Sequence, residues 1–464
     1  MTLALIRGGQ PMTLKQQLYL TFQLSTPAIM AQLSSIIMQY IDASMVGSLG
    51  ANASASIGLV STTTWLFWGL CTAAATGFSV QVAHHIGAGN REAAKSVLRQ
   101  SIVMTLLFSV VLLLIGSAIS GVLPRWLGGD ASINQDASLY FLIFSLSLPA
   151  LQLNFLGGSM LRCSGNMYIP SLLNVLMCLL DVVFNTLLIF PAWEFHLFSM
   201  TFSLPGAGLG VMGAALGTTF AELVTAGVMM WFLCFRSKEL KLVGGCGSFL
   251  PKANCLWKAI RISTPMGCEH IILCGAQILT TVIVAPLGTF AIAANSFAIT
   301  AESLCYMPGY GIADAATTLI GHSLGAGRKD LARRFAWITV LTGMAVMTFM
   351  GIIMYIAAPL MMSMMTPDAE VQALGVMALR TEAFAEPMFA ASIVGYGVFV
   401  GAGDTLIPSV MNLFSIWMVR LTLAAILAPA MGLQGVWIAM CIELCFRGLI
   451  FLIRLHKGKW MKIV

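Results

Sequence analysis

The chain has 464 residues, of which 58% are hydrophobic and only 9% are charged, and its formal net charge is +6. Soluble domains carry about 25% charged residues. A composition this poor in charge excludes a soluble enzyme, a disordered regulator and a nucleic-acid-binding protein. The fold class that remains is an all-α integral membrane protein.

Twelve apolar runs are each long enough to cross a bilayer, which requires about 20 helical residues. In chain order they cover residues 20–46, 52–83, 98–121, 138–160, 169–191, 208–235, 260–286, 289–321, 335–360, 374–400, 406–428 and 433–455. Most of the 24 Lys and Arg residues fall in tails and loops on one side of this arrangement. Because basic residues stay on the cytoplasmic side, we expect both termini in the cytoplasm.

The sequence repeats itself at one constant offset along the chain. The matched segments are Ser25-Thr26-Pro27 with 263–265, Gly87-Ala88-Gly89 with 325–327, Ile169-Pro170-Ser171 with 407–409, and Asn174 with Asn412. Each copy has six spans, so both copies enter the membrane in the same sense. This pattern is typical of transporters built from parallel repeats.

The repeat predicts the domain organisation. We expect two six-helix lobes around a central cavity, at residues 1–235 and 261–464, joined by a basic cytoplasmic linker at 236–260. Two lobes that face each other across a cavity suit alternating access, in which one lobe rocks against the other.

Carboxyl groups inside a membrane are costly and indicate functional sites. Asp42 lies in the first span, and Asp181 lies in the fifth span, one helical turn before Asn185. The spacing of four residues places Asp181 and Asn185 on one helical face. A buried carboxyl that is reached from one side at a time can couple transport to an ion gradient. Because Thr280 and Val419 replace the two acids in the second copy, we expect a single cation site.

Several charged residues of the second half also fall within spans. Glu269 and Glu302 are candidates for lining a cavity that takes cationic substrates, and a structural role is equally open for both. Asp314 is expected to be solvated near the cytoplasmic end. Arg420 and Glu443 are expected to form a structural ion pair with each other or with the backbone.

Four segments then allow a comparison with known families. They read IDASMVGSLGA at 41–51, MPGYGIADAATTLIG at 307–321, GHSLGAG at 321–327 and GAGDTLIPSVMN at 401–412. In their order and spacing they resemble the multidrug and toxic compound extrusion (MATE) family over nearly the whole chain. The resemblance implies a monomeric antiporter of the bacterial inner membrane that needs no cofactor. Such a protein exports small organic, often cationic compounds in exchange for H⁺ or Na⁺.

The resemblance also implies roles for individual residues. The aspartate of the family's first span takes part in cation coupling and corresponds to Asp42. The fifth-span pattern of the family places the amide first, whereas this chain has Asp181 before Asn185. The threonine of the sixth span falls on Thr218. The cation-coupling set is therefore Asp42, Asp181, Asn185 and Thr218, and the substrate-cavity candidates are Asn154, Glu269 and Glu302.

Coupling to H⁺ is favoured over coupling to Na⁺. A glutamate in the seventh span of one family branch corresponds to Leu273, which is apolar, and Glu269 lies one turn earlier. This difference disfavours a Na⁺ site in the second lobe, so any metal ion would be Na⁺ at the cation-coupling residues.

Two alternatives stay open. A lipid or oligosaccharide-lipid flippase would share the two lobes but needs cationic side chains in its cavity, for which Arg162 and Arg420 are the candidates. A membrane-embedded enzyme would show clustered D-x-x-D or histidine motifs at helix ends, and the sequence has none. We therefore expect no enzymatic activity and no nucleic-acid partner.

Overall fold

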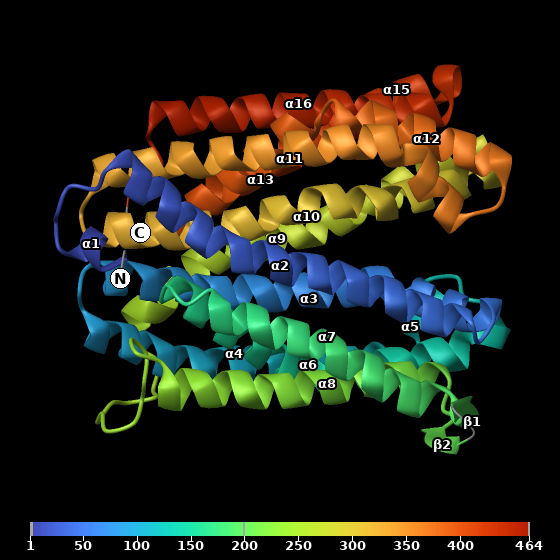
Figure 1. The fold of residues 1–464 in the computed structure, drawn as a ribbon, viewed down its shortest axis with the longest axis horizontal. Coiled ribbons are helices and arrows are strands. Elements are labelled where there is room, and N and C mark those ends of the chain that lie inside the picture. Colours follow the sequence, from blue (N-terminus) through green and yellow to red (C-terminus); the bar gives the residue numbers. More distant parts are fainter. Residues whose placement is uncertain (1–2, 198–199, 463–464) are drawn as a thin grey trace.

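The computed structural model describes residues 3–197 and 200–462, which fold almost entirely into helices (Figure 1). The first half contains α1 (Leu3–Arg7), α2 (Leu14–Gly47), α3 (Ala51–Gly87), α4 (Arg91–Ile119), α5 (Leu123–Trp126), α6 (Ala131–Cys163), α7 (Tyr168–Ile189) and α8 (Val211–Trp231). The second half contains α9 (Ala253–Val284), α10 (Thr289–Gly325), α11 (Lys329–Met365), α12 (Ala369–Ala383), α13 (Glu386–Gly401), α14 (Leu406–Phe414), α15 (Leu421–Met431) and α16 (Leu433–Lys457).

Shorter segments complete the helices. The π-helical segment η1 (Phe232–Arg236) extends α8, and the π-helical segment η3 (Ser415–Arg420) joins α14 to α15. A 3₁₀ turn, η2 (Ala285–Leu287), follows α9. We call α2–α8 the first repeat and α9–α16 the second repeat.

The helix count agrees with twelve membrane spans. Within the described residues, nine helical stretches are long and apolar enough to cross a bilayer, and the bent pair α12–α13 forms a tenth. Helices α2 and α10, with 34 and 37 residues, complete the set. Polar caps begin several of these helices: Thr13 and Gln16 form a capping box at α2, and Asn90 caps α4.

The repeat is confirmed in the helix boundaries. Helices α3 and α10 begin and end at matching positions of the repeat. Helices α4 and α11 also begin at matching positions. The counterpart of α6 is α12 together with α13. We expected one continuous span at 374–400, but the chain bends there by 62° between α12 and α13. Pro387, at the start of α13, cannot donate the backbone hydrogen bond that would continue α12.

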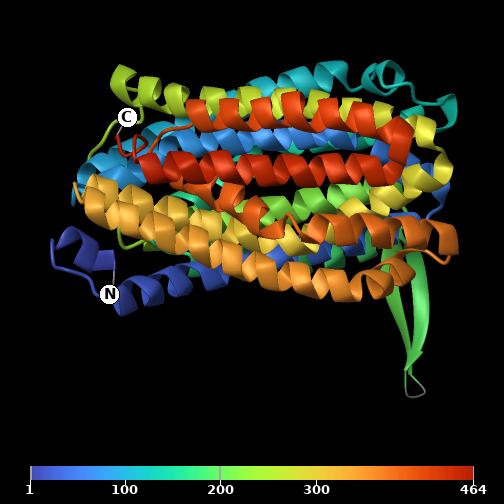
Figure 2. The same ribbon diagram turned by 90° about the horizontal axis from the view of Figure 1, so that it is seen from above.

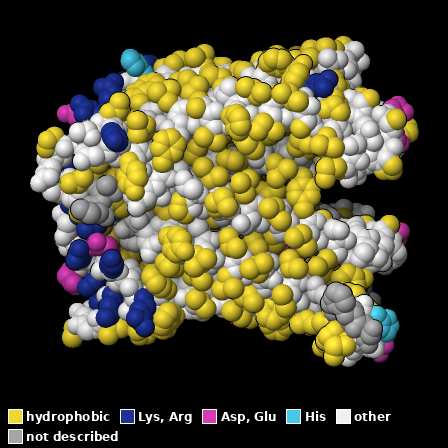
Figure 3. All heavy atoms as spheres, in the orientation of Figure 1, with side chains coloured by type: hydrophobic (Ala, Val, Ile, Leu, Met, Phe, Trp, Pro, Cys, Tyr) yellow, Lys and Arg dark blue, Asp and Glu magenta, His cyan; other side chains and the backbone are white. Residues whose placement is uncertain are grey.

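A β-hairpin follows α7 and has no counterpart among the described residues of the second repeat. Strand β1 (Pro191–Leu197) pairs antiparallel with β2 (Met200–Ala207), a structure that the sequence did not predict. Figure 2 shows the hairpin projecting beyond the helices. We call this the hairpin end of the molecule. The opposite end, which holds both chain termini, is the basic end, because Lys and Arg side chains gather there in Figure 3.

The two ends of the molecule differ in how closely the repeats approach each other. Figure 3 shows an open notch between the two halves of the molecule at the hairpin end. At the basic end, His84 Nε2 lies 2.8 Å from the carbonyl oxygen of Gly401, and His322 Nε2 lies 2.7 Å from that of Cys163. Both hydrogen bonds join one repeat to the other. His84 and His322 occupy equivalent positions in the two repeats, and so do Cys163 and Gly401. The two hydrogen bonds are therefore equivalent contacts related by the repeat.

Glycines let the same helices touch backbone to backbone. A Cβ atom at Gly87 in α3 would lie 2.3 Å from the carbonyl oxygen of His322 in α10. A Cβ atom at Gly325 in α10 would lie 2.2 Å from the carbonyl oxygen of His84 in α3. No side chain fits in this space, so the basic end closes only because both positions lack one.

Gly87→Ala should therefore disturb the contact between the repeats. The added methyl group must push α10 away, at a cost of ~1–3 kcal/mol for overpacking. We expect a lower thermal unfolding midpoint for the purified variant in detergent. Gly58→Ala in the same helix is the matched control, because a Cβ atom there meets nothing within 4 Å. Equal unfolding midpoints for the two variants would contradict the prediction.

Candidate functional site

Asp42, Asp181 and Asn185 meet between α2 and α7. The side-chain amide of Asn185 donates to Asp42 Oδ1 at 3.0 Å and to Asp181 Oδ2 at 3.1 Å. The carboxyl groups of Asp42 and Asp181 are also close enough to interact electrostatically. Asp181 and Asn185 are fully buried, whereas Asp42 is half-buried. The structure thus brings together three of the four residues of the predicted cation-coupling set.

This cluster has unused acceptor atoms. Asp181 Oδ1 and Asn185 Oδ1 are buried, and no donor among the described residues reaches either oxygen. An amide has two N–H bonds, and both are already directed at the carboxyl groups. Because buried acceptors without partners are costly, the cluster is suited to bind a proton or a small cation.

The helices around the cluster are held at close range. A Cβ atom at Gly217 in α8 would lie 2.0 Å from Asn185 Oδ1, so α8 packs directly over the amide. Further along α7, Asn174 donates to the carbonyl oxygen of Ala31 and to Ser35 Oγ, which ties α7 to α2. Thr218, the fourth predicted residue, is half-buried and makes no side-chain hydrogen bond to the cluster within the described residues.

A third acid of the first repeat was not predicted from the sequence. Glu222 in α8 is 6% exposed and has Ser147 of α6 beside it. Its electrostatic neighbours include Asp181 and Tyr140. The sequence feature that could have identified Glu222 is that it is a single acid within an apolar run. The amide of the predicted cavity residue Asn154 donates to the backbone carbonyl of Glu222 at 3.1 Å, and Asn154 Oδ1 has no partner among the described residues.

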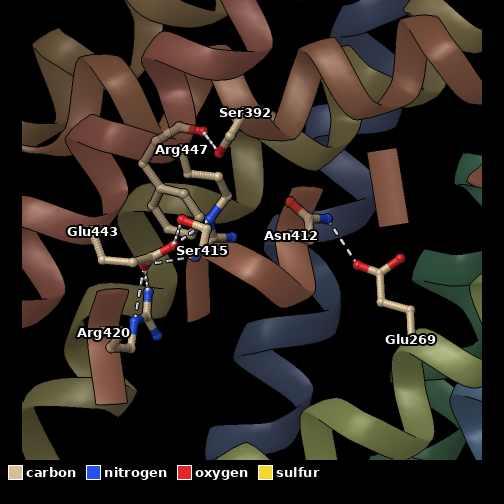
Figure 4. A network of polar contacts seen from close by, with 8 residues as sticks. Glu269, Ser392, Asn412, Ser415, Arg420, Glu443 and Arg447 are labelled. Carbon is tan, nitrogen blue, oxygen red and sulfur yellow. Dashed lines mark hydrogen bonds and ion pairs between the residues drawn. The ribbon is translucent and has the colours of Figure 1, made fainter. Parts of the chain in front are cut away.

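Glu269 is held by three donors rather than facing open space. Its Oε2 accepts from Tyr396 at 2.8 Å and from Ser409 at 2.7 Å. Its Oε1 accepts from the Asn412 amide at 2.8 Å, a bond that Figure 4 shows between α14 and α9. Asn412 is the repeat mate of Asn174, so both asparagines tie corresponding helices together. The prediction of a substrate-cavity role for Glu269 stays untested, and its contacts are those of a structural group.

Glu302 belongs to a second carboxyl cluster. Glu302 of α10, Glu382 of α12 and Glu386 of α13 each offer an oxygen, and these oxygens lie within 4.8 Å of one another. All three side chains are buried, and no donor among the described residues reaches the oxygens of Glu382 or Glu386. The bend between α12 and α13 places Glu382 and Glu386 on either side of the break. The prediction of a single cation site stays untested, and this second cluster was not predicted from the sequence.

The predicted ion pair between Arg420 and Glu443 is confirmed and is part of a larger network (Figure 4). Arg420 donates to Glu443 Oε2 from Nε at 2.9 Å and from Nη2 at 2.6 Å. Arg447, which has no predicted role, donates to both oxygens at 2.8 and 2.9 Å. Ser415 Oγ donates to Oε1 at 2.6 Å. Because Ser415 and Arg420 are the two ends of η3, the π-helical turn brings both side chains to one carboxylate.

We expected Asp314 to be solvated, but it also interacts with the first repeat. It is partly exposed and lies 3.8 Å from Arg162 Nε of the first repeat. The hydroxyl of Thr318, one turn further along α10, donates to the carbonyl oxygen of Arg162 at 3.0 Å. These contacts add to the closure of the basic end.

Comparisons with known proteins agree with this architecture. The MatE family model matches residues 27–187 and again residues 265–426. The probable multidrug resistance protein NorM of Thermotoga maritima is 25% identical over 95% of this chain and 92% of its own length. The multidrug resistance protein NorM of Burkholderia vietnamiensis is 24% identical over 97% of this chain and 96% of its own length.

Solved structures show the same fold. A MOP superfamily transporter from Pyrococcus furiosus is 19% identical and superposes with a TM-score of 0.87 over 99% of this chain and 98% of its own. The Vibrio cholerae MATE transporter VcmN in its bent form is 19% identical, with a TM-score of 0.83 over 96% of this chain and 97% of its own. Because the family model covers most of both repeats, the chain belongs to the MatE family.

Proposed function

We propose that this protein is a cation-coupled antiporter that exports small organic, chiefly cationic compounds from the cell. The names of the relatives, multidrug resistance proteins, support export of toxic compounds. The concentration of Lys and Arg at the basic end supports a cytoplasmic location for that end and for both termini. The protein acts as a monomer in the inner membrane, with lobes at 1–235 and 261–464 and a linker at 236–260.

The observation that carries the proposal is the cluster of Asp42, Asp181 and Asn185. Two carboxyl groups in contact repel each other when both are charged, so the cluster favours an added proton or cation. Its unpartnered oxygens support the same conclusion. Binding of a proton or cation there changes the charge between α2 and α7. If the ligand binds more tightly to one arrangement of these helices, it shifts the protein toward that arrangement.

The coupling ion is H⁺ rather than Na⁺. Asn185 directs its two N–H bonds, not its oxygen, at the carboxyl groups. The amide therefore adds no oxygen ligand for a metal ion between the carboxyl groups, whereas a proton needs only the carboxyl oxygens.

The closed basic end and the open hairpin end support alternating access with this conformation facing outward. Opening to the cytoplasmic side requires the contacts of His84 and His322 to break. Exchange also requires that the substrate and H⁺ oppose each other's binding. Each ligand then weakens the binding of the other by the same factor.

The cluster of Glu302, Glu382 and Glu386 supports a preference for cationic substrates. Three buried carboxyl groups close together create a negative potential that an organic cation can neutralise. The cluster disfavours an anionic lipid headgroup. The arginines that a flippase cavity would need are also engaged, because Arg420 binds Glu443 and Arg162 lies close to Asp314.

Asp42→Asn should abolish efflux of a cationic dye driven by a pH gradient in reconstituted vesicles. An amide cannot take up and release the proton that couples the gradient to the conformational change. Asp136→Asn is the matched control, because Asp136 is exposed. Undiminished efflux by Asp42→Asn would contradict the coupling role.

A Na⁺ gradient with the pH clamped should drive little efflux in the same vesicles. The Asn185 amide directs its N–H groups rather than its oxygen at the carboxyl groups, so it adds no ligand for Na⁺ between them. Strong efflux driven by Na⁺ alone would show that Na⁺ is the coupling ion.

Glu302→Gln should raise the KM for cationic substrates more than for neutral ones, because it removes one of three charges near the substrate. We expect about a fivefold difference between the two classes, which corresponds to ~1 kcal/mol. Transport of a monovalent cationic dye and of a neutral dye of similar size measures the difference. Equal changes in KM would make Glu302 a structural residue.

A further inference from the structure

A groove on the outer surface of the second repeat lies outside the sites described above. It has a volume of about 390 Å³ and runs between α14 and α16. Its apolar walls are Val410, Met411 and Phe414 from α14 and Phe446, Ile450 and Ile453 from α16. Figure 2 shows both helices side by side on one outer face of the molecule.

The packing of the neighbouring helices explains the groove. At the hairpin end, a Cβ atom at Gly435 of α16 would lie 2.4 Å from the carbonyl oxygen of Leu427 in α15, so those two helices touch. Toward the basic end, α14 contacts α16 only sparsely. The helices therefore diverge from the hairpin end to the basic end, and the space between them opens at the membrane surface.

The walls of the groove face lipid. Val410 is 55% exposed, Phe414 is 51% exposed and Ile453 is 45% exposed. In a membrane-spanning helix, apolar side chains this exposed contact acyl chains rather than water. A lipid chain is therefore the occupant that matches the walls.

The basic end of the groove is positively charged. Arg454, Lys457 and Lys459 lie there. Lys457 and Lys459 are exposed, and neither has a carboxylate within 4.0 Å in the described part of the chain. Arg454 pairs with Asp404, but its buried Nε has no partner among the described residues. One carboxylate thus faces three cations, which leaves an excess of positive charge.

The length of the groove matches one leaflet. Phe446 precedes Lys457 by eleven residues, which is ~16 Å along an α-helix. Half of a ~30 Å hydrocarbon core is ~15 Å. A chain that reaches Phe446 therefore leaves its headgroup level with Lys457 and Lys459.

We propose that this groove binds an anionic phospholipid of the leaflet at the basic end. One acyl chain lies between α14 and α16, and the phosphate lies against Lys457 and Lys459, beside Arg454. A zwitterionic lipid fills the same walls but carries, beside its phosphate, a positive charge that the lysines repel. The groove therefore selects headgroup charge, and this selection is independent of the coupling site and of the transported compound.

The test compares phosphatidylglycerol with phosphatidylcholine of identical chains, added to the full-length protein in a neutral detergent. We expect phosphatidylglycerol to raise the thermal unfolding midpoint more and to bind more tightly in native mass spectrometry. In K457Q/K459Q, affinity for phosphatidylglycerol should fall by about 25-fold, or about fivefold for each lysine. Both lysines are exposed, so the variant should fold normally.

Two further variants complete the test. K238Q/K241Q removes the same charge from exposed positions in the linker and should keep the preference for phosphatidylglycerol. I450W fills the groove while both lysines stay, and it should weaken binding of both lipids. Equal binding of the two lipids to the unmodified protein would overturn the proposal. An equal loss in K457Q/K459Q and K238Q/K241Q would also overturn it, because charge alone would then explain the binding.

Discussion

The backbone contact between α3 and α10 at the basic end is the constraint on which the rest of the arrangement depends. Gly87 and Gly325 let the helices approach until a methyl group no longer fits, and His84 and His322 then bond the carbonyl ends of helices in the opposite repeat. Because each contact has its repeat mate, the two halves are joined symmetrically.

Scaffold and chemistry follow different rules in this duplicated chain. Contacts that position helices occur in both repeats, as Asn174 and Asn412 illustrate. The acids do not recur: Asp42 is matched by Thr280, and Glu302 by Thr64. Each repeat thus holds its own carboxyl cluster at a different place. The two halves therefore share a scaffold but differ in where their buried acids lie.

The order of the helices could be predicted from the apolar runs of the sequence. The pairing of the repeats could be predicted from the constant offset between matching residues. Contact between Asp42 and α7 was expected only from the family resemblance, since it depends on how α2 packs. The bend before α13 is the clearest case. Pro149 and Pro387 are repeat mates, yet α6 stays continuous through Pro149 whereas the chain breaks before Pro387. Local sequence does not distinguish the two outcomes, so the approach of Glu382 to Glu386 was not foreseen.

The three buried glutamates have a consequence for how the second repeat responds to its surroundings. Groups this close titrate as a unit, because charge on one changes the free energy of charging the others. The first positive charge to arrive relieves the strongest repulsion, and each later one gains less. The geometry of Glu302, Glu382 and Glu386 therefore suits uptake of charge in steps rather than all at once.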